Sequence, residues 1–211
     1  ARANAWASRH ILGRATAIIP RPRRQSARNR NTDAQTPHQA AKKYAMTLAV
    51  IGLGSNIDDP PQRLQEASHR LCALTGLSSH RVSRVYSSPP MGPQDQPPFF
   101  NAVLTADCSN EASDLLLSLK AIEQSMGRVQ KRRWGERCID LDIIQFGELE
   151  LDTTNLVIPH PGLCERLFVI QPMIDLLGPN HKVPGLRDLG TLRRALLDHS
   201  LTTCEAFELH L

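Results

Sequence analysis

The chain has 211 residues and a formal net charge of +4, with 41% hydrophobic and 22% charged residues. This length supports one good core with at most a small appendage, so one domain is expected. Ten Lys and Arg residues against one acid give residues 1–45 a net charge of +9, which leaves −5 for residues 46–211. The net positive charge of the chain therefore comes from residues 1–45, and it is no evidence that residues 46–211 bind nucleic acid.

Residues 1–45 form a basic leader without a sustained apolar period. Such a composition cannot bury enough surface to offset the entropy of ordering, so we expect disorder here and a single domain over residues 46–211. The Arg-rich, acid-poor leader is also typical of an organelle transit peptide, and a start at Met46 is the alternative. Five cysteines without a CxxC pair indicate reduced thiols. We expect a cytoplasmic protein, with organelle import if the leader is a transit peptide.

The expected elements follow the order β-α-β-β-α-β. Hydrophobic periodicity predicts a buried strand at 47–56, a helix at 58–74, a partly exposed strand at 78–88, a strand at 99–107, a helix at 111–127 capped by Asn110 or Ser109, and a strand at 138–147. Five prolines and a glycine exclude regular structure at 89–98. Further helices are expected at 165–177 and 191–199. This order predicts an α+β fold: a ferredoxin-like βαββαβ core, with helices layered on a mostly antiparallel sheet, plus C-terminal helices.

The stretch RWGERCIDLDII, residues 133–144, places two aspartates after a basic loop. A strand sends alternate side chains to the same face, so Asp140 and Asp142 point the same way. Paired carboxylates suit Mg²⁺, which bridges to phosphate oxygens, and arginines complement phosphate charge. Two exposed aspartates on an edge strand are the alternative interpretation. The sequence contains neither the Walker A pattern nor the complete dinucleotide glycine pattern.

The same stretch resembles the signature of the 6-hydroxymethyl-7,8-dihydropterin pyrophosphokinase family. Further family motifs match in order at Gly54–Asn56, Tyr86–Asn101, Glu123–Arg128 and Ile158–Pro161. The resemblance implies an ATP-dependent diphosphotransferase of folate biosynthesis, which transfers pyrophosphate from MgATP to hydroxymethyldihydropterin and gives AMP and the pterin diphosphate. In many eukaryotes this domain is fused to dihydropteroate synthase. This chain is too short to add that barrel, so we expect a monofunctional enzyme.

The resemblance also implies roles for individual residues. The catalytic group would be Arg128, Arg137, Asp140 and Asp142, with two Mg²⁺ ions held by Asp140 and Asp142. The pterin would be bound by Ser88, Pro89, Met91, Phe99, Asn101, Trp134 and Phe168. ATP would be bound by Glu123, Lys131, Ile143, His160 and Arg166. Taken alone, the two phenylalanines would be assigned to the core and Glu123 to a solvated helix face.

Three positions depart from the family pattern. Gln130 stands where relatives often have an arginine, which Lys131 or Arg132 would replace, and Asn155 and Val157 stand where some members present an arginine and a hydroxyl to ATP. The expected partners are ATP and the pterin, without nucleic acid or membrane, and we expect a monomer. The alternative from another class is a non-catalytic ferredoxin-like module whose basic leader binds nucleic acid. The sequence lacks the exposed aromatics among basic residues that mark RNA-binding sheets.

Overall fold

The computed structural model describes residues 46–129, 134–197, 206–207 and 209. The predicted leader lies outside these residues, as does Lys131. In chain order the elements are β1 (Thr47–Ser55), α2 (Pro60–Cys72), β2 (Leu77–Val82), β3 (Val85–Ser88), β4 (Phe99–Cys108), α3 (Ala112–Ser125), β5 (Asp140–Phe146), β6 (Leu151–Asp152), β7 (Val157–Ile158), the 3-10 helix η1 (Leu163–Glu165), α4 (Leu167–Leu177), α5 (Leu189–Leu197) and β8 (Ala206–Phe207).

The main sheet has six strands, in the order β5-β1-β4-β3-β8 with β2 also paired to β4. All of these pairings are antiparallel. Strand β4 lies between β1 and β2, so the β1-α2-β2 unit is split by a strand that comes later in the chain. This is the ferredoxin-like arrangement, and it confirms the predicted fold class.

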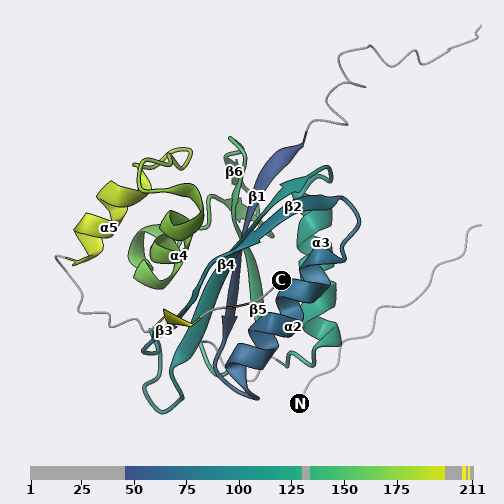
Figure 1. The fold of residues 1–211 in the computed structure, drawn as a ribbon, viewed down its shortest axis with the longest axis vertical. Helices are drawn as coiled ribbons and strands as arrows, with labels where there is room; N and C mark the ends of the chain where they lie inside the picture. Colours follow the sequence, from purple (N-terminus) through teal and green to yellow (C-terminus); the bar gives the residue numbers. More distant parts are fainter. Residues whose placement is uncertain (1–45, 130–133, 198–205, 208, 210–211) are drawn as a thin grey trace, which may run out of the picture. The chain divides into compact units, whose positions relative to one another are not determined.

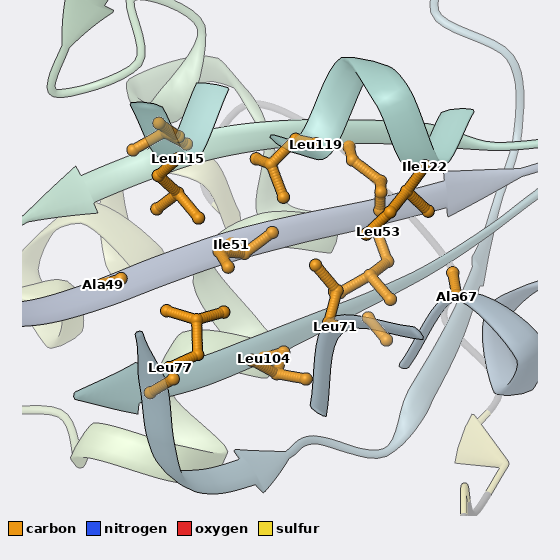
Figure 2. Close-up of a cluster of buried hydrophobic side chains, with 14 of the residues drawn as sticks. Ala49, Ile51, Leu53, Ala67, Leu71, Leu77, Leu104, Leu115, Leu119 and Ile122 are labelled. Atoms are coloured by element: carbon orange, nitrogen blue, oxygen red, sulfur yellow. The ribbon is translucent and has the colours of Figure 1, made fainter. Parts of the chain in front are cut away.

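Helices cover both faces of this sheet, α2 and α3 on one side and α4 and α5 on the other (Figure 1). Alternation along β1 separates the two cores. Ala49, Ile51 and Leu53 pack with α2 and α3, as Figure 2 shows, whereas Val50 packs with the α4 side. The next two positions on the α4 side, Gly52 and Gly54, have no side chain, and that is where the cavity described below opens. Among the described residues, no helix is long and apolar enough to cross a bilayer.

Two local predictions were wrong. The strand predicted at 78–88 is two strands, because Ser83 leaves the regular ladder: its hydroxyl accepts from the Val103 N–H at 3.0 Å while its own N–H donates to the Val103 carbonyl at 2.9 Å. Helix α3 is preceded by Glu111 instead of a capping Asn110 or Ser109. The Asn110 amide donates to the Thr75 carbonyl at 3.0 Å and is thereby used in a tertiary contact. The β6–β7 hairpin was not predicted.

Helix α3 offers a matched test of the core. Leu119 is 0% exposed and Leu117, two residues earlier, is 69% exposed. Leu119→Ala is expected to lower the free energy of unfolding by about 2–5 kcal/mol, because it removes buried methyl groups and leaves a cavity. Leu117→Ala is expected to change it by less than about 0.5 kcal/mol. Urea denaturation followed by circular dichroism measures both, and equal effects would contradict the assigned orientation of α3.

Candidate active site

A cavity of about 460 Å³ lies on the α4 side of the sheet. Its size is in the range of small-molecule sites. Its wall combines the ends of β1, β4 and β5 with residues of the proline-rich loop, of the segment 134–137 and of the chain from His160 to Val169. Segments that are far apart in sequence therefore meet around one space.

Two glycines of β1 make the floor of this cavity. Gly54 is paired with Asp140 on one side and Asn101 on the other, and Gly52 is paired with Asp142. A Cβ on Gly54 would lie 3.3 Å from the Asn101 Oδ1, and one on Gly52 would lie 3.0 Å from the Ile144 Cδ1. Larger residues here would crowd these neighbours and fill the space between the two aspartates and the asparagine.

Asp140 and Asp142 both line the cavity, as their spacing predicted. The Arg128 Nη1 lies 2.6 Å from the Asp140 Oδ1, and the Arg137 guanidinium pairs with the Oδ2. Burial by itself would raise the pKa of Asp140, but the charges of Arg128, Arg137 and Lys120 outweigh it and hold that pKa below its usual range. The carboxylate is thus ionised and ready to bind cations at neutral pH.

The free edge of β5 is covered by two side chains of α3. The Leu141 N–H donates to the Glu123 Oε1 at 2.6 Å, and the Leu141 carbonyl accepts from the Lys120 ammonium at 3.0 Å. These groups take the place of a neighbouring strand. Lys120 also lies 3.0 Å from Glu123 and 3.6 Å from Asp142, while Arg128 bridges Glu123 and Asp140. Both backbone polar groups of Leu141, the residue between the two aspartates, are thus hydrogen-bonded to side chains of α3.

This edge contact predicts a stability effect for Glu123, which is 3% exposed. Glu123→Gln is expected to lower the free energy of unfolding by about 1–3 kcal/mol, because an amide oxygen accepts more weakly than a carboxylate and its NH₂ has no acceptor among these cations. Glu111→Gln, on the exposed residue before the same helix, is the control and is expected to change stability by less than about 0.5 kcal/mol. Equal unfolding midpoints in urea for the two variants would contradict the proposal that Glu123 stabilises the edge of β5.

His160 lies beside β5, where its N–H donates to the Ile144 carbonyl at 2.9 Å. Its Nδ1 accepts from the Gly162 N–H at 3.0 Å, so the neutral ring carries its proton on Nε2, which lies 4.0 Å from the Asp142 Oδ2. Burial lowers the pKa of His160, and the nearby carboxylate of Asp142 offsets this only in part. The ring is therefore a neutral donor at physiological pH.

The other end of the cavity combines aromatic rings with amide and hydroxyl groups. The Asn101 amide donates to the Ser88 hydroxyl at 3.1 Å, and both side chains are buried. Phe99 and Phe168 line the same space. The Arg137 guanidinium carbon lies 5.7 Å from the centroid of the Phe99 ring, so this arginine touches both the aromatic end and the carboxylate end.

Trp134 lines one side of the cavity; the residue is 52% exposed and its backbone has φ 60°. A Cβ on Gly92 would lie 2.8 Å from the Trp134 Cβ. Only glycine therefore permits this close approach of the proline-rich loop to the segment 134–137.

Most of the predicted site residues come together in this cavity. Its lining includes Ser88, Pro89, Met91, Phe99, Asn101, Trp134, Arg137, Asp140, Asp142, His160, Arg166 and Phe168. Arg128 and Glu123 do not line it and lie behind Asp140. The Ile143 side chain is 2% exposed in the core with α2 and α3, on the opposite face, so Ile144 supplies the side chain at the cavity wall. If Ile143 contacts ATP, it can do so only through its backbone N–H or carbonyl group.

Sequence reasoning missed three residues that organise the site: Lys120, Asn56 and Gln96. Lys120 stands three residues before Glu123 on one helix, and that spacing was the available signal. Asn56 and Gln96 stand inside motifs that were recognised, but their contacts with each other, with Trp134 and with Arg137 span 38 to 81 residues of sequence. Nothing local indicates such contacts.

The donor set fits magnesium that is shared with a ligand. Among the described residues there is no group of three or more His, Cys, Asp or Glu side chains suited to holding a metal. Asp140 and Asp142 supply two carboxylates, and the Asp142 side chain is 35% exposed. Mg²⁺ usually takes one or two carboxylates and completes its shell with water and substrate phosphates. The chain offers that kind of partial site.

Comparisons with known proteins agree with this geometry. A family model described as 7,8-dihydro-6-hydroxymethylpterin-pyrophosphokinase (HPPK) matches residues 50–178. The 2-amino-4-hydroxy-6-hydroxymethyldihydropteridine pyrophosphokinase of Pseudomonas aeruginosa is 41% identical over 145 residues, which cover 69% of this chain and 89% of the relative. The enzyme of the same name from Haemophilus influenzae is 39% identical over 142 residues, or 65% and 89%.

A solved structure shows the same fold at low sequence identity. Wild-type HPPK-DHPS of Plasmodium falciparum, crystallised with pteroate, aligns with a TM-score of 0.59 and 15% identity. The alignment covers 72% of this chain and 43% of that longer polypeptide. At this identity the likeness concerns the fold alone.

Proposed function

This chain belongs to the 7,8-dihydro-6-hydroxymethylpterin-pyrophosphokinase family, and from that premise we propose how its cavity carries out the family's reaction. It is an ATP-dependent diphosphotransferase that transfers pyrophosphate to 6-hydroxymethyl-7,8-dihydropterin in folate biosynthesis. One observation carries the assignment of the site: the acidic and basic groups suited to ATP phosphates and the aromatic and amide groups suited to a pterin line a single cavity.

The pterin occupies the aromatic end. Phe99 and Phe168 offer ring faces to a flat heterocycle, and Asn101, held by Ser88, offers an amide to its hydrogen-bonding edge. Trp134 covers the outer side. The hydroxymethyl group then points toward the aspartates, because the floor glycines Gly52 and Gly54 leave that direction open.

The phosphates of ATP occupy the charged end. Asp140 and Asp142 would hold Mg²⁺, two ions by resemblance to the family, and the metal when bound supplies positive charge to the phosphate oxygens. Arg137 would exchange its bond to Asp140 for the phosphates, since its guanidinium already lies between the carboxylate and the aromatic end. Arg128, His160 and Arg166 add positive charge or hydrogen-bond donors nearby, and Glu123 acts through Arg128.

The reaction then depends mainly on alignment. The hydroxymethyl oxygen forms a bond to the β-phosphorus of ATP, the bond from that phosphorus to the oxygen of AMP breaks, and the hydroxyl proton leaves to solvent. The cavity contributes by holding the oxygen close to the phosphorus and by stabilising charge on the transferred group.

The direct test is AMP release by the purified chain. AMP is expected from ATP only when hydroxymethyldihydropterin and Mg²⁺ are both present, and EDTA is expected to stop it reversibly. AMP release without the pterin would contradict the proposal and would indicate a simple nucleotide hydrolase.

Three further predictions accompany this proposal. The monomeric state is tested by light scattering of the purified chain. The cytoplasmic location, and organelle import as its alternative, are tested by following a fluorescent fusion with and without residues 1–45. Independent folding of residues 46–211 is tested by comparing the unfolding of that fragment with that of the whole chain.

A further inference from the structure

Two buried side-chain amides, those of Asn56 and Gln96, lie between three segments that reach the cavity. Asn56 follows β1, Gln96 belongs to the proline-rich loop 89–98, and the third segment is 134–137. The two residues are 2% and 8% exposed. Neither is among the residues that line the cavity, so they have no direct access to a ligand there.

Gln96 joins the proline-rich loop to the segment 134–137. Its Nε2 donates one hydrogen bond within its own loop, to the Pro93 carbonyl at 2.8 Å, and one across to the Trp134 carbonyl at 2.9 Å. Its Oε1 accepts from the Asn56 Nδ2 at 3.2 Å. A single side chain thus touches all three segments.

Asn56 completes the connection. Its Nδ2 also donates to the Pro97 carbonyl at 3.2 Å, and its Oδ1 accepts from the Arg137 N–H at 2.9 Å. The Asn56 N–H donates in turn to the Arg137 carbonyl at 3.1 Å. Both side-chain amides therefore use both of their N–H donors and their carbonyl oxygen, and the buried pair is fully satisfied.

We propose that Asn56 and Gln96 are positioning residues that couple the pterin end of the cavity to its phosphate end. The inference rests on the proposed function. Loop 89–98 contributes Pro89 and Met91 to the pterin end of the cavity, whereas the segment 134–137 contributes Trp134 to the pterin end and Arg137 to the phosphate end. Neither segment can shift alone without breaking the Gln96–Trp134 hydrogen bond or a bond to Asn56, which lies between them, and each broken bond leaves a polar group without a partner. A ligand that fixes one wall therefore favours the arrangement of the other.

This coupling is measurable as a ratio of affinities. Calorimetric titration of the full chain gives the dissociation constant of hydroxymethyldihydropterin with and without a non-hydrolysable ATP analogue and Mg²⁺. For the wild type we expect the nucleotide to tighten pterin binding within the range of about 5–150-fold that is typical of coupled sites. For Gln96→Met, which keeps the side-chain length and removes all three polar contacts, we expect a ratio near one while each ligand still binds alone.

Gln94 provides a matched control in the same loop. Its Nε2 also donates to two carbonyls, those of Pro90 at 2.9 Å and Gly92 at 2.8 Å, but both lie within its own loop. Gln94→Met is expected to retain the wild-type ratio. Asn56→Asp is a second, independent variant: it keeps the acceptor for the Arg137 N–H, loses both donated bonds and is expected to reduce the ratio as Gln96→Met does. Thermal unfolding of each variant shows that the protein titrated is folded.

The outcomes separate this inference from the proposed function. A wild-type ratio of one, or wild-type ratios in both Gln96→Met and Asn56→Asp, would overturn the coupling. An equal loss in Gln94→Met would also overturn it, because general loosening of the loop would then suffice. Turnover is measured beside the titrations: a wild-type chain without pterin-dependent AMP release overturns the proposed function whatever the ratios are.

Discussion

Asp142→Ala is expected to abolish measurable turnover while the fold stays intact. The Asp142 side chain is 35% exposed at the cavity and packs into no core, so its removal leaves no buried void. What it removes is one of the two carboxylates proposed to hold Mg²⁺. Loss of metal-based charge stabilisation of several kcal/mol corresponds to a fall in kcat of about 10³-fold or more.

Asp152→Ala is the matched control, because Asp152 is an exposed aspartate of β6 outside the cavity lining. It is expected to retain wild-type kcat. Steady-state assays of AMP formation at increasing Mg²⁺ measure both variants, and circular dichroism follows the fold. Full activity in Asp142→Ala would refute the metal assignment.

Arg137→Ala is expected to slow the chemical step far more than it weakens pterin binding. The guanidinium lies between Asp140 and the Phe99 ring, where the transferred diphosphoryl group passes in the proposed reaction. Removing one preorganised charge donor of this kind typically lowers kcat by about 10²–10³-fold. The dissociation constant of the pterin is expected to change by less than about tenfold, since the lost contact over one aromatic face is worth only about 1 kcal/mol.

Single-turnover quench experiments separate the two effects. Arg137→Lys keeps the charge without the planar fork and is expected to recover only part of the rate. Arg187→Ala, on an exposed residue away from the cavity, is expected to match the wild type. A pure binding defect in Arg137→Ala, with an unchanged single-turnover rate, would contradict its role in the chemical step.

The part of the fold that could be predicted is the part that periodicity determines. Strand alternation from Ile139 to Ile143 placed Asp140 and Asp142 on one face, and they do line one cavity. The same alternation should have excluded the Ile143 side chain from that face, since Ile143 is one position from Asp142 and three from Asp140, an odd separation in both cases. The resemblance implied an ATP contact for Ile143, and the geometry allows this contact only through the backbone of that residue.

The features that could not be predicted from the sequence depend on contacts between residues that are far apart in the chain. The break of the predicted strand at Ser83 depends on paired bonds to Val103, and the predicted cap residue Asn110 is used by Thr75. Neither partner is near in sequence. Glu123 was an ambiguous helix carboxylate until the free edge of β5 supplied the Leu141 N–H as its partner. Composition and spacing do not contain such information.

The central claim is that this cavity transfers a diphosphoryl group intact to the pterin hydroxyl. The most direct measurement is product analysis by ³¹P NMR and mass spectrometry after incubation of the purified chain with MgATP and hydroxymethyldihydropterin labelled with ¹⁸O in its hydroxymethyl group. The account predicts AMP without ¹⁸O and an equal amount of pterin diphosphate that retains the label. ADP with a pterin monophosphate, or ¹⁸O in AMP, would contradict it.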